Sequence, residues 1–75
     1  MTERQWKEEI DRIVSGAGLP YRPVASWLEQ GRFCCADLAD QRTGKDRTVR
    51  VCHQTHATPA ERRAEVVRQL QLSAR

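Results

Sequence analysis

Two runs of alternating residues on either side of a glycine turn constrain the fold of this chain most strongly. Residues 32–40 and 47–54 both place apolar side chains at alternate positions, which is typical of half-buried strands. Thr43-Gly44 lies in the segment that joins them, and glycine favours a tight turn there. The sequence therefore predicts an antiparallel β-hairpin.

The apolar positions also predict the register of this hairpin. A two-residue turn places Leu38 opposite Val49, and it places Ala36 opposite Val51. Both apolar sets then lie on one face of the sheet, whereas a shift by one residue would set Ala36 against Arg50. On the other face, this register pairs Asp37 with Arg50 and Cys35 with Cys52.

Two helices with N-terminal capping signals enclose the strands in the sequence. Thr2 and Gln5 fit a capping box, and apolar side chains then recur at helical spacing, which predicts a helix over residues 3–15. Thr58-Pro59-Ala60-Glu61 combines a threonine cap, proline at the first helical position and a capping-box glutamate. It predicts a second helix over residues 59–72.

The segment between the first helix and the hairpin fits two structures. Residues 19–23 contain two prolines and are predicted to be a connector outside regular pairing. Residues 24–30 fit either a short helix that begins at Pro23 or a strand that turns at Gln30-Gly31. We favour the strand, because a sheet of only two strands is marginally stable.

The expected fold is a small single α+β domain over residues 1–75 with the order α-β-β-β-α. Each helix has one apolar stripe, so we expect both helices to pack on one face of a three-stranded antiparallel sheet. The predicted core consists of Trp6, Ile10, Ile13, Val14, Ala36, Leu38, Val49, Val51, Ala64, Val67 and Leu70. In the last helix, Arg62 is expected to face water.

Length and composition limit the classes of function. A chain of 75 residues buries little surface, which argues against a deep active site and makes a homodimer a reasonable expectation. No run approaches ~18 apolar residues, and Met1–Gln5 lacks the apolar segment of a signal peptide, so we expect no membrane span and a cytoplasmic location. The three cysteines are then expected to be reduced thiols. The excess of arginine over lysine, together with many alanines, suggests a GC-rich bacterial or phage genome. We expect a phage or mobile element to encode the chain.

Metal and enzyme chemistry are weakly supported. Cys34, Cys35, Cys52, His53 and His56 are the only cluster of metal-type ligands. Adjacent residues of a strand point to opposite faces, so at most two of these ligands converge, and a structural zinc site needs four. Cys34 opposite His53 would be the one nucleophile–base pair, and no orienting acid accompanies it. We therefore predict no metal, no cofactor and no enzymatic activity.

Positive charge gathers in the second half of the chain. Residues 1–40 have a net charge of −2 and residues 41–75 a net charge of +5, which together give the overall +3. Arginine and lysine side chains on a projecting hairpin are suited to contacts with phosphate groups. The predicted site for a nucleic acid or another anionic partner comprises Arg42, Lys45, Arg47 and Arg50, extended by Arg62 and Arg63 at the start of the last helix.

A second candidate surface is apolar. If residues 24–30 form a strand, Trp27, Leu28 and Phe33 lie near the first hairpin turn, and part of this set faces away from the helices. An exposed apolar patch on so small a protein is typical of a protein or dimer interface.

The element order, with Pro20-Tyr21 just before the first strand, resembles the double-stranded RNA-binding domain. That family clamps phosphates with lysines at the start of its last helix, where this chain has Thr58-Pro59-Ala60-Glu61 and then Arg62 and Arg63. We expect a binding module that contacts nucleic acid or a nucleoprotein complex through the basic hairpin. The alternative is an inhibitor or adaptor that binds a host protein. In size and in its lack of catalytic residues, the chain is similar to anti-CRISPR proteins.

Overall fold

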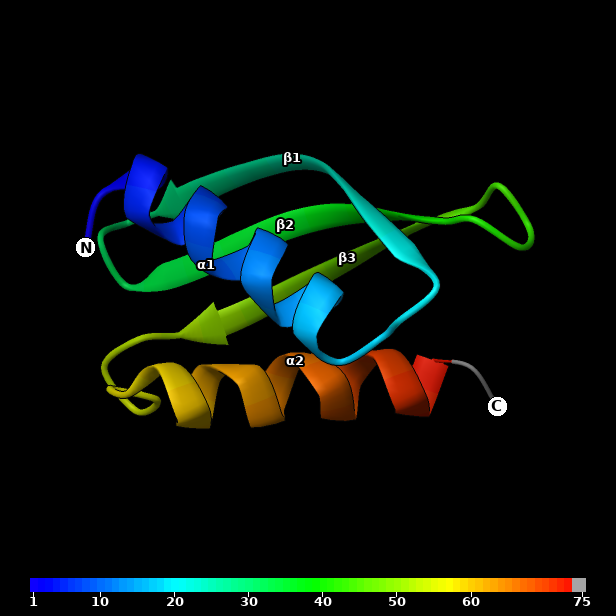
Figure 1. The fold of residues 1–75 in the computed structure, drawn as a ribbon. Helices are drawn as coiled ribbons and strands as arrows, with labels where there is room; N and C mark the ends of the chain where they lie inside the picture. The colour runs from blue at the N-terminus through cyan, green and yellow to red at the C-terminus, as the bar shows by residue number, and fades with distance from the viewer. Residues whose placement is uncertain (74–75) are drawn as a thin grey trace.

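The computed structural model describes residues 1–73, and for Leu72 and Ser73 it describes the backbone alone. The predicted order α-β-β-β-α is confirmed (Figure 1). The strands form one antiparallel sheet in the order β1-β2-β3. The elements are α1 (Glu3–Gly16), β1 (Tyr21–Glu29), β2 (Phe33–Asp40), β3 (Asp46–Cys52) and α2 (Pro59–Ser73).

Both helices begin where their capping signals predict. The amide of Gln5 donates to Thr2 Oγ1 at 3.1 Å, and the amide of Thr2 donates back to Gln5 Oε1 at 2.8 Å. At the start of α2, the amide of Glu61 donates to Thr58 Oγ1 at 3.2 Å. These bonds satisfy amides that would otherwise lack partners in the first turn.

Residues 24–29 belong to a strand that turns at Gln30-Gly31, as predicted, but this strand begins earlier than expected. β1 starts at Tyr21 and runs through Pro23, which pairs with Leu38. The prediction that residues 19–23 lie outside regular pairing was therefore wrong for its last three residues. β1 is an edge strand with a bulge at Val24, and an edge position tolerates a residue without an amide hydrogen.

The β2–β3 hairpin has the predicted faces but a different register. Residues 41–44 form a four-residue loop. Two backbone hydrogen bonds close it: the Asp40 amide donates to the Lys45 carbonyl, and the Gly44 amide donates to the Asp40 carbonyl. The register therefore moves by two residues, and Ala36 now faces Val49. A shift by two keeps every side chain on its face, so the apolar set stays buried. The side chain of Asp40 accounts for the longer loop, because it accepts the amide of Arg42 at 2.8 Å in an Asx-type turn.

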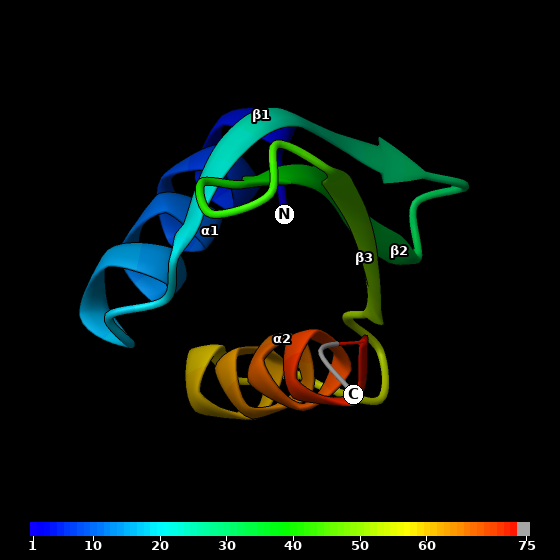
Figure 2. The same ribbon diagram turned by 90° about the vertical axis from the view of Figure 1, so that its right-hand side faces the viewer.

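Both helices lie on the concave side of the curved sheet, as predicted (Figure 2). α1 packs mainly against β1, and α2 packs along β3. The two helices therefore lie over opposite edge strands of the sheet. The predicted core is confirmed except for Ala64, which is exposed, and Val67, which is half-buried. The buried residues that complete the core are Val66, Tyr21, Cys34 and Cys35.

α2 also protects the free edge of the sheet. The side-chain amide of Gln69 accepts the Arg50 amide at 3.1 Å and donates to the Arg50 carbonyl at 2.8 Å. This pair of bonds occupies one position of an edge that could otherwise pair with another chain. No helix within residues 1–73 is long and apolar enough to cross a membrane.

Candidate nucleic-acid interface

The hairpin tip (residues 41–47) extends beyond both helices at one end of the molecule (Figure 1). Residues 41–46 are all exposed. Arg42 is held by Asp40, with its Nε 3.2 Å from Oδ1 and its Nη2 3.2 Å from Oδ2. The hydrogen bonds from Arg42 lower the pKa of the Asp40 carboxyl, and the same contact raises the pKa of Arg42. Arg42 is therefore a cation of fixed position that already has a partner.

Lys45 and Arg47 differ from Arg42 in this respect. Within the part of the chain that the structure describes, neither takes part in an ion pair. Lys45 is exposed, and Arg47 is half-buried opposite Leu38, on the face of the sheet that carries the helices. The tip thus presents two cations without carboxylate partners beside one that is already paired.

Arg50 lies away from the tip, on the open face of the sheet. The prediction that it faces Asp37 was wrong, because the longer loop moves it opposite Cys35. Its Nη2 lies 3.0 Å from Glu29 Oε2, and its guanidinium carbon lies 4.1 Å from the centre of the Phe33 ring. Arg50 is therefore engaged by a carboxylate and by an aromatic ring.

The two arginines at the start of α2 have opposite environments. Arg62, expected to face water, is only 6% exposed. It contacts both carboxylate oxygens of Glu9, at 2.6 and 2.7 Å, and donates to the His56 and Ala57 carbonyls at 3.1 and 3.0 Å. Arg62 is consequently unavailable to phosphates, whereas Arg63 is exposed.

The predicted apolar surface is divided between the two faces of the sheet. Leu28 lies on the helix side and packs against the core. Trp27 and Phe33 lie on the open face, and both are half-buried. Trp27 Nε1 donates to Glu29 Oε1 at 3.0 Å, and this bond is the main cause of the lowered pKa of Glu29. The open face is thus a network of aromatic and charged side chains, not a bare apolar patch.

The cysteines are not brought together as expected. In the observed register, Cys34 faces Val51 and Cys35 faces Arg50, so neither the Cys34–His53 pair nor the Cys35–Cys52 pair forms. All three thiols are free. No group of three or more metal-type ligands occurs among the described residues.

The three thiols should differ in reactivity. Burial raises the pKa of Cys34 to about 11 and also raises that of Cys35, whereas backbone hydrogen bonds from Thr55 and Gln54 lower that of Cys52. Because the thiolate is the reactive form, we expect one fast reaction with a disulfide reagent at pH 8, at Cys52. The variant Cys52→Ser should lose this phase, and Cys34 and Cys35 should react only as the protein unfolds. A fast phase that persists in Cys52→Ser would contradict the assignment.

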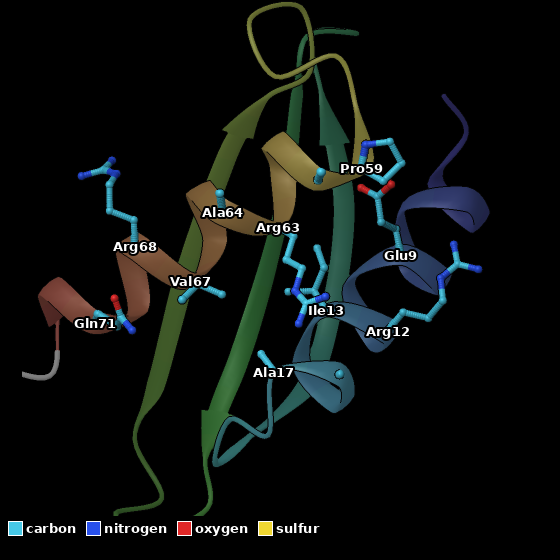
Figure 3. A pocket seen from close by; sticks show the side chains of 12 residues that line it. Glu9, Arg12, Ile13, Ala17, Pro59, Arg63, Ala64, Val67, Arg68 and Gln71 are labelled. Atoms are coloured by element: carbon cyan, nitrogen blue, oxygen red, sulfur yellow. The ribbon is translucent and has the colours of Figure 1, made fainter.

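Sequence reasoning missed one concave feature of the helical layer. An open groove of about 1090 Å³ runs between α1 and α2 (Figure 3). It is lined by apolar residues that include Ile13 and Val67 and by Arg12 and Arg63. The sequence pattern predicts that Ala64 is buried in the core, but the structure leaves it exposed in the lining of this groove.

Comparison with protein-family models, with curated proteins and with solved structures found no match to this chain.

Proposed function

We propose that this chain is a non-enzymatic binding module whose β2–β3 hairpin contacts the phosphate groups of a nucleic acid. The projection of the tip beyond the helices supports this function, because a projecting two-stranded ribbon can enter a nucleic-acid groove. Its exposed residues include Arg42 and Lys45, and the half-buried Arg47 follows them.

The observation that carries the proposal is that Lys45 and Arg47 take part in no ion pair within residues 1–73. Among the described residues, Arg4, Arg42, Arg50, Arg62 and Arg68 each pair with a carboxylate. A paired cation must give up its carboxylate before it can bind a phosphate, whereas a free cation releases only water and counterions. Lys45 and Arg47 are therefore the most effective phosphate contacts on the hairpin, with Arg42 beside them.

Binding should depend steeply on salt and on these two residues. We expect labelled duplex DNA, duplex RNA or single-stranded RNA to bind at low salt, with an affinity that falls as salt rises. In Lys45→Ala/Arg47→Ala, the slope of log K against log salt should decrease by about 1 for each lost phosphate contact. Fluorescence polarisation at several salt concentrations measures both effects and identifies the preferred nucleic acid.

The matched control removes two positive charges from a remote surface. Arg4 and Lys7 are exposed on α1, so Arg4→Ala/Lys7→Ala has the same net charge as the hairpin variant. If both variants lose affinity equally, binding reflects net charge alone and the hairpin is not the site. An absence of binding at low salt, where charge attraction is strongest, would also refute the proposal.

A protein-binding inhibitor or adaptor is the second candidate function. It requires an uncovered surface with apolar and charged parts, and the groove between α1 and α2 has both. A cytoplasmic location agrees with either function, and it is supported by the three free thiols.

A further inference from the structure

The groove between the helices has an apolar floor whose α2 side is open to solvent. Ala60, Ala64 and Val67 recur at helical spacing along α2, a pattern that predicts burial. Ala60 and Ala64 are nevertheless exposed, and Val67 is only half-buried. Ile13 lies on the α1 side of the same groove (Figure 3).

The floor is made largely of small side chains. Besides the alanines of α2, the α1 wall includes Gly16 and Ala17. Small side chains allow the backbone of another helix to approach closely. On α2 the lining runs from Pro59 to Gln71, which at about 1.5 Å per residue is roughly 18 Å, or three helical turns. The groove therefore has the length that a short helix needs.

The charges around the groove are positive. Arg63 extends from α2 toward α1, and Arg12 lies on the α1 side of the groove (Figure 3). Arg68, on the α2 side, is already paired with Glu65. The one acidic residue in the lining, Glu9, is already bound by Arg62. Arg12 and Arg63 take part in no ion pair within the described part of the chain.

We propose that this groove binds an acidic amphipathic helix of another protein. The apolar side of such a helix would cover Ala60, Ala64 and Val67, and its carboxylates would meet Arg12 and Arg63. This is the helix-in-groove mode of recognition, in which apolar anchors recur every three to four residues. The site is separate from the hairpin tip, so the chain could join a nucleic acid to a protein.

Two other occupants fit less well. In a symmetric dimer across this groove, each copy would place Arg12 and Arg63 close to those of its partner, and like charges repel. A nucleic acid would meet a floor of alanine and valine, which offers no aromatic ring on which a base could stack. The positive charges of Arg12 and Arg63 and the apolar floor of the groove together favour an acidic amphipathic helix as its occupant.

A synthetic peptide pair tests the proposal on the full chain. One helical peptide carries leucine at three- and four-residue spacing and glutamate on its flanks, and the other carries lysine in place of glutamate. Nuclear magnetic resonance spectra of isotope-labelled protein should show the acidic peptide binding about tenfold or more tightly than the basic one. The shifted signals should come from the groove, including those of Ala64 and Val67.

Substitutions at exposed positions separate binding from folding. Ala64→Glu should abolish binding of the acidic peptide, and Arg12→Glu should weaken it and strengthen binding of the basic peptide. Val24→Glu also introduces a glutamate at an exposed apolar position outside the groove, and Arg22→Glu makes the same charge reversal there; both should bind like the wild type. Circular dichroism measures whether all four variants fold.

Several results would overturn the proposal. These are equal binding of both peptides, unchanged binding by Ala64→Glu, and no binding up to about 1 mM peptide. Groove signals that shift with protein concentration alone would identify a second copy as the occupant. Groove signals that shift with an RNA or DNA oligonucleotide, and not with the acidic peptide, would identify a nucleic acid. A failure of the hairpin test leaves these outcomes unaffected, because the two sites share no residue.

Discussion

Replacing Arg62 with methionine should lower the free energy of unfolding by about 3–5 kcal/mol. The Arg62 side chain is 7% exposed and that of Glu9 is 9% exposed, so Arg62→Met leaves a buried carboxylate without its cation. The variant also removes the donors to the His56 and Ala57 carbonyls, which lie just before α2. Urea unfolding followed by circular dichroism measures the loss.

Two further variants show whether the loss comes from the unpaired charge. In Glu9→Leu/Arg62→Met, both charges are replaced by apolar groups, and most of the stability should return. Arg63→Met, at the next position but exposed, should cost at most about 1 kcal/mol. If Arg62→Met were as mild as Arg63→Met, the pair would be a surface contact, and the connection it makes between α1 and α2 would be unimportant.

The same buried arginine explains which part of α2 could not be predicted from the sequence. The helix itself followed from Thr58 and Glu61, because capping is a local interaction. Its buried face followed only in part. Leu70 is buried as predicted, but the buried face includes Arg62 in place of Ala64 and Val67. Arg62 is buried because Glu9 on α1 neutralises it, and this contact joins residues far apart in the sequence.

In the hairpin, both the correct and the incorrect part of the prediction concern interactions that are local in the sequence. The alternation of apolar residues predicted which face of β2 and β3 is buried, and that prediction is confirmed for Ala36 and Val49. The length of the loop depends on the Asp40 side chain, which accepts the Arg42 amide and is not part of the apolar pattern. The longer loop moves Arg50 by two positions and replaces its predicted partner, Asp37, by Glu29.

These corrections reduce the candidate phosphate site to fewer residues than the sequence predicted. A sequence gives the position of each charge along the chain, but the effective charge depends on which carboxylates fold against it. Arg50 and Arg62 are both engaged in this way, whereas Lys45 and Arg47 pair with no carboxylate of the described residues. Arg12, which was not part of the predicted site, lies in the groove between the helices.

Trp6 should be the most sensitive single position in the core. Its side chain is fully buried, and its Nε1 donates to the Cys35 carbonyl at 2.7 Å, which ties α1 to the central strand. Trp6→Ala should cost about 3–5 kcal/mol through the cavity it leaves. A domain of this size has a total stability of roughly 5–10 kcal/mol, so this variant should be largely unfolded even at low urea concentrations.

Trp6→Phe separates the hydrogen bond from the packing. It keeps an aromatic ring in the core but leaves the Cys35 carbonyl without its donor, at an expected cost of about 1–3 kcal/mol. Trp27→Phe is the matched control, because Trp27 is half-buried and its bond to Glu29 lies on the open face, where water can replace it. Urea midpoints should therefore fall clearly for Trp6→Phe and little for Trp27→Phe. Equal shifts in the two variants would mean that the Trp6–Cys35 bond adds no more than a surface contact, and that α1 is held to the sheet by apolar packing alone.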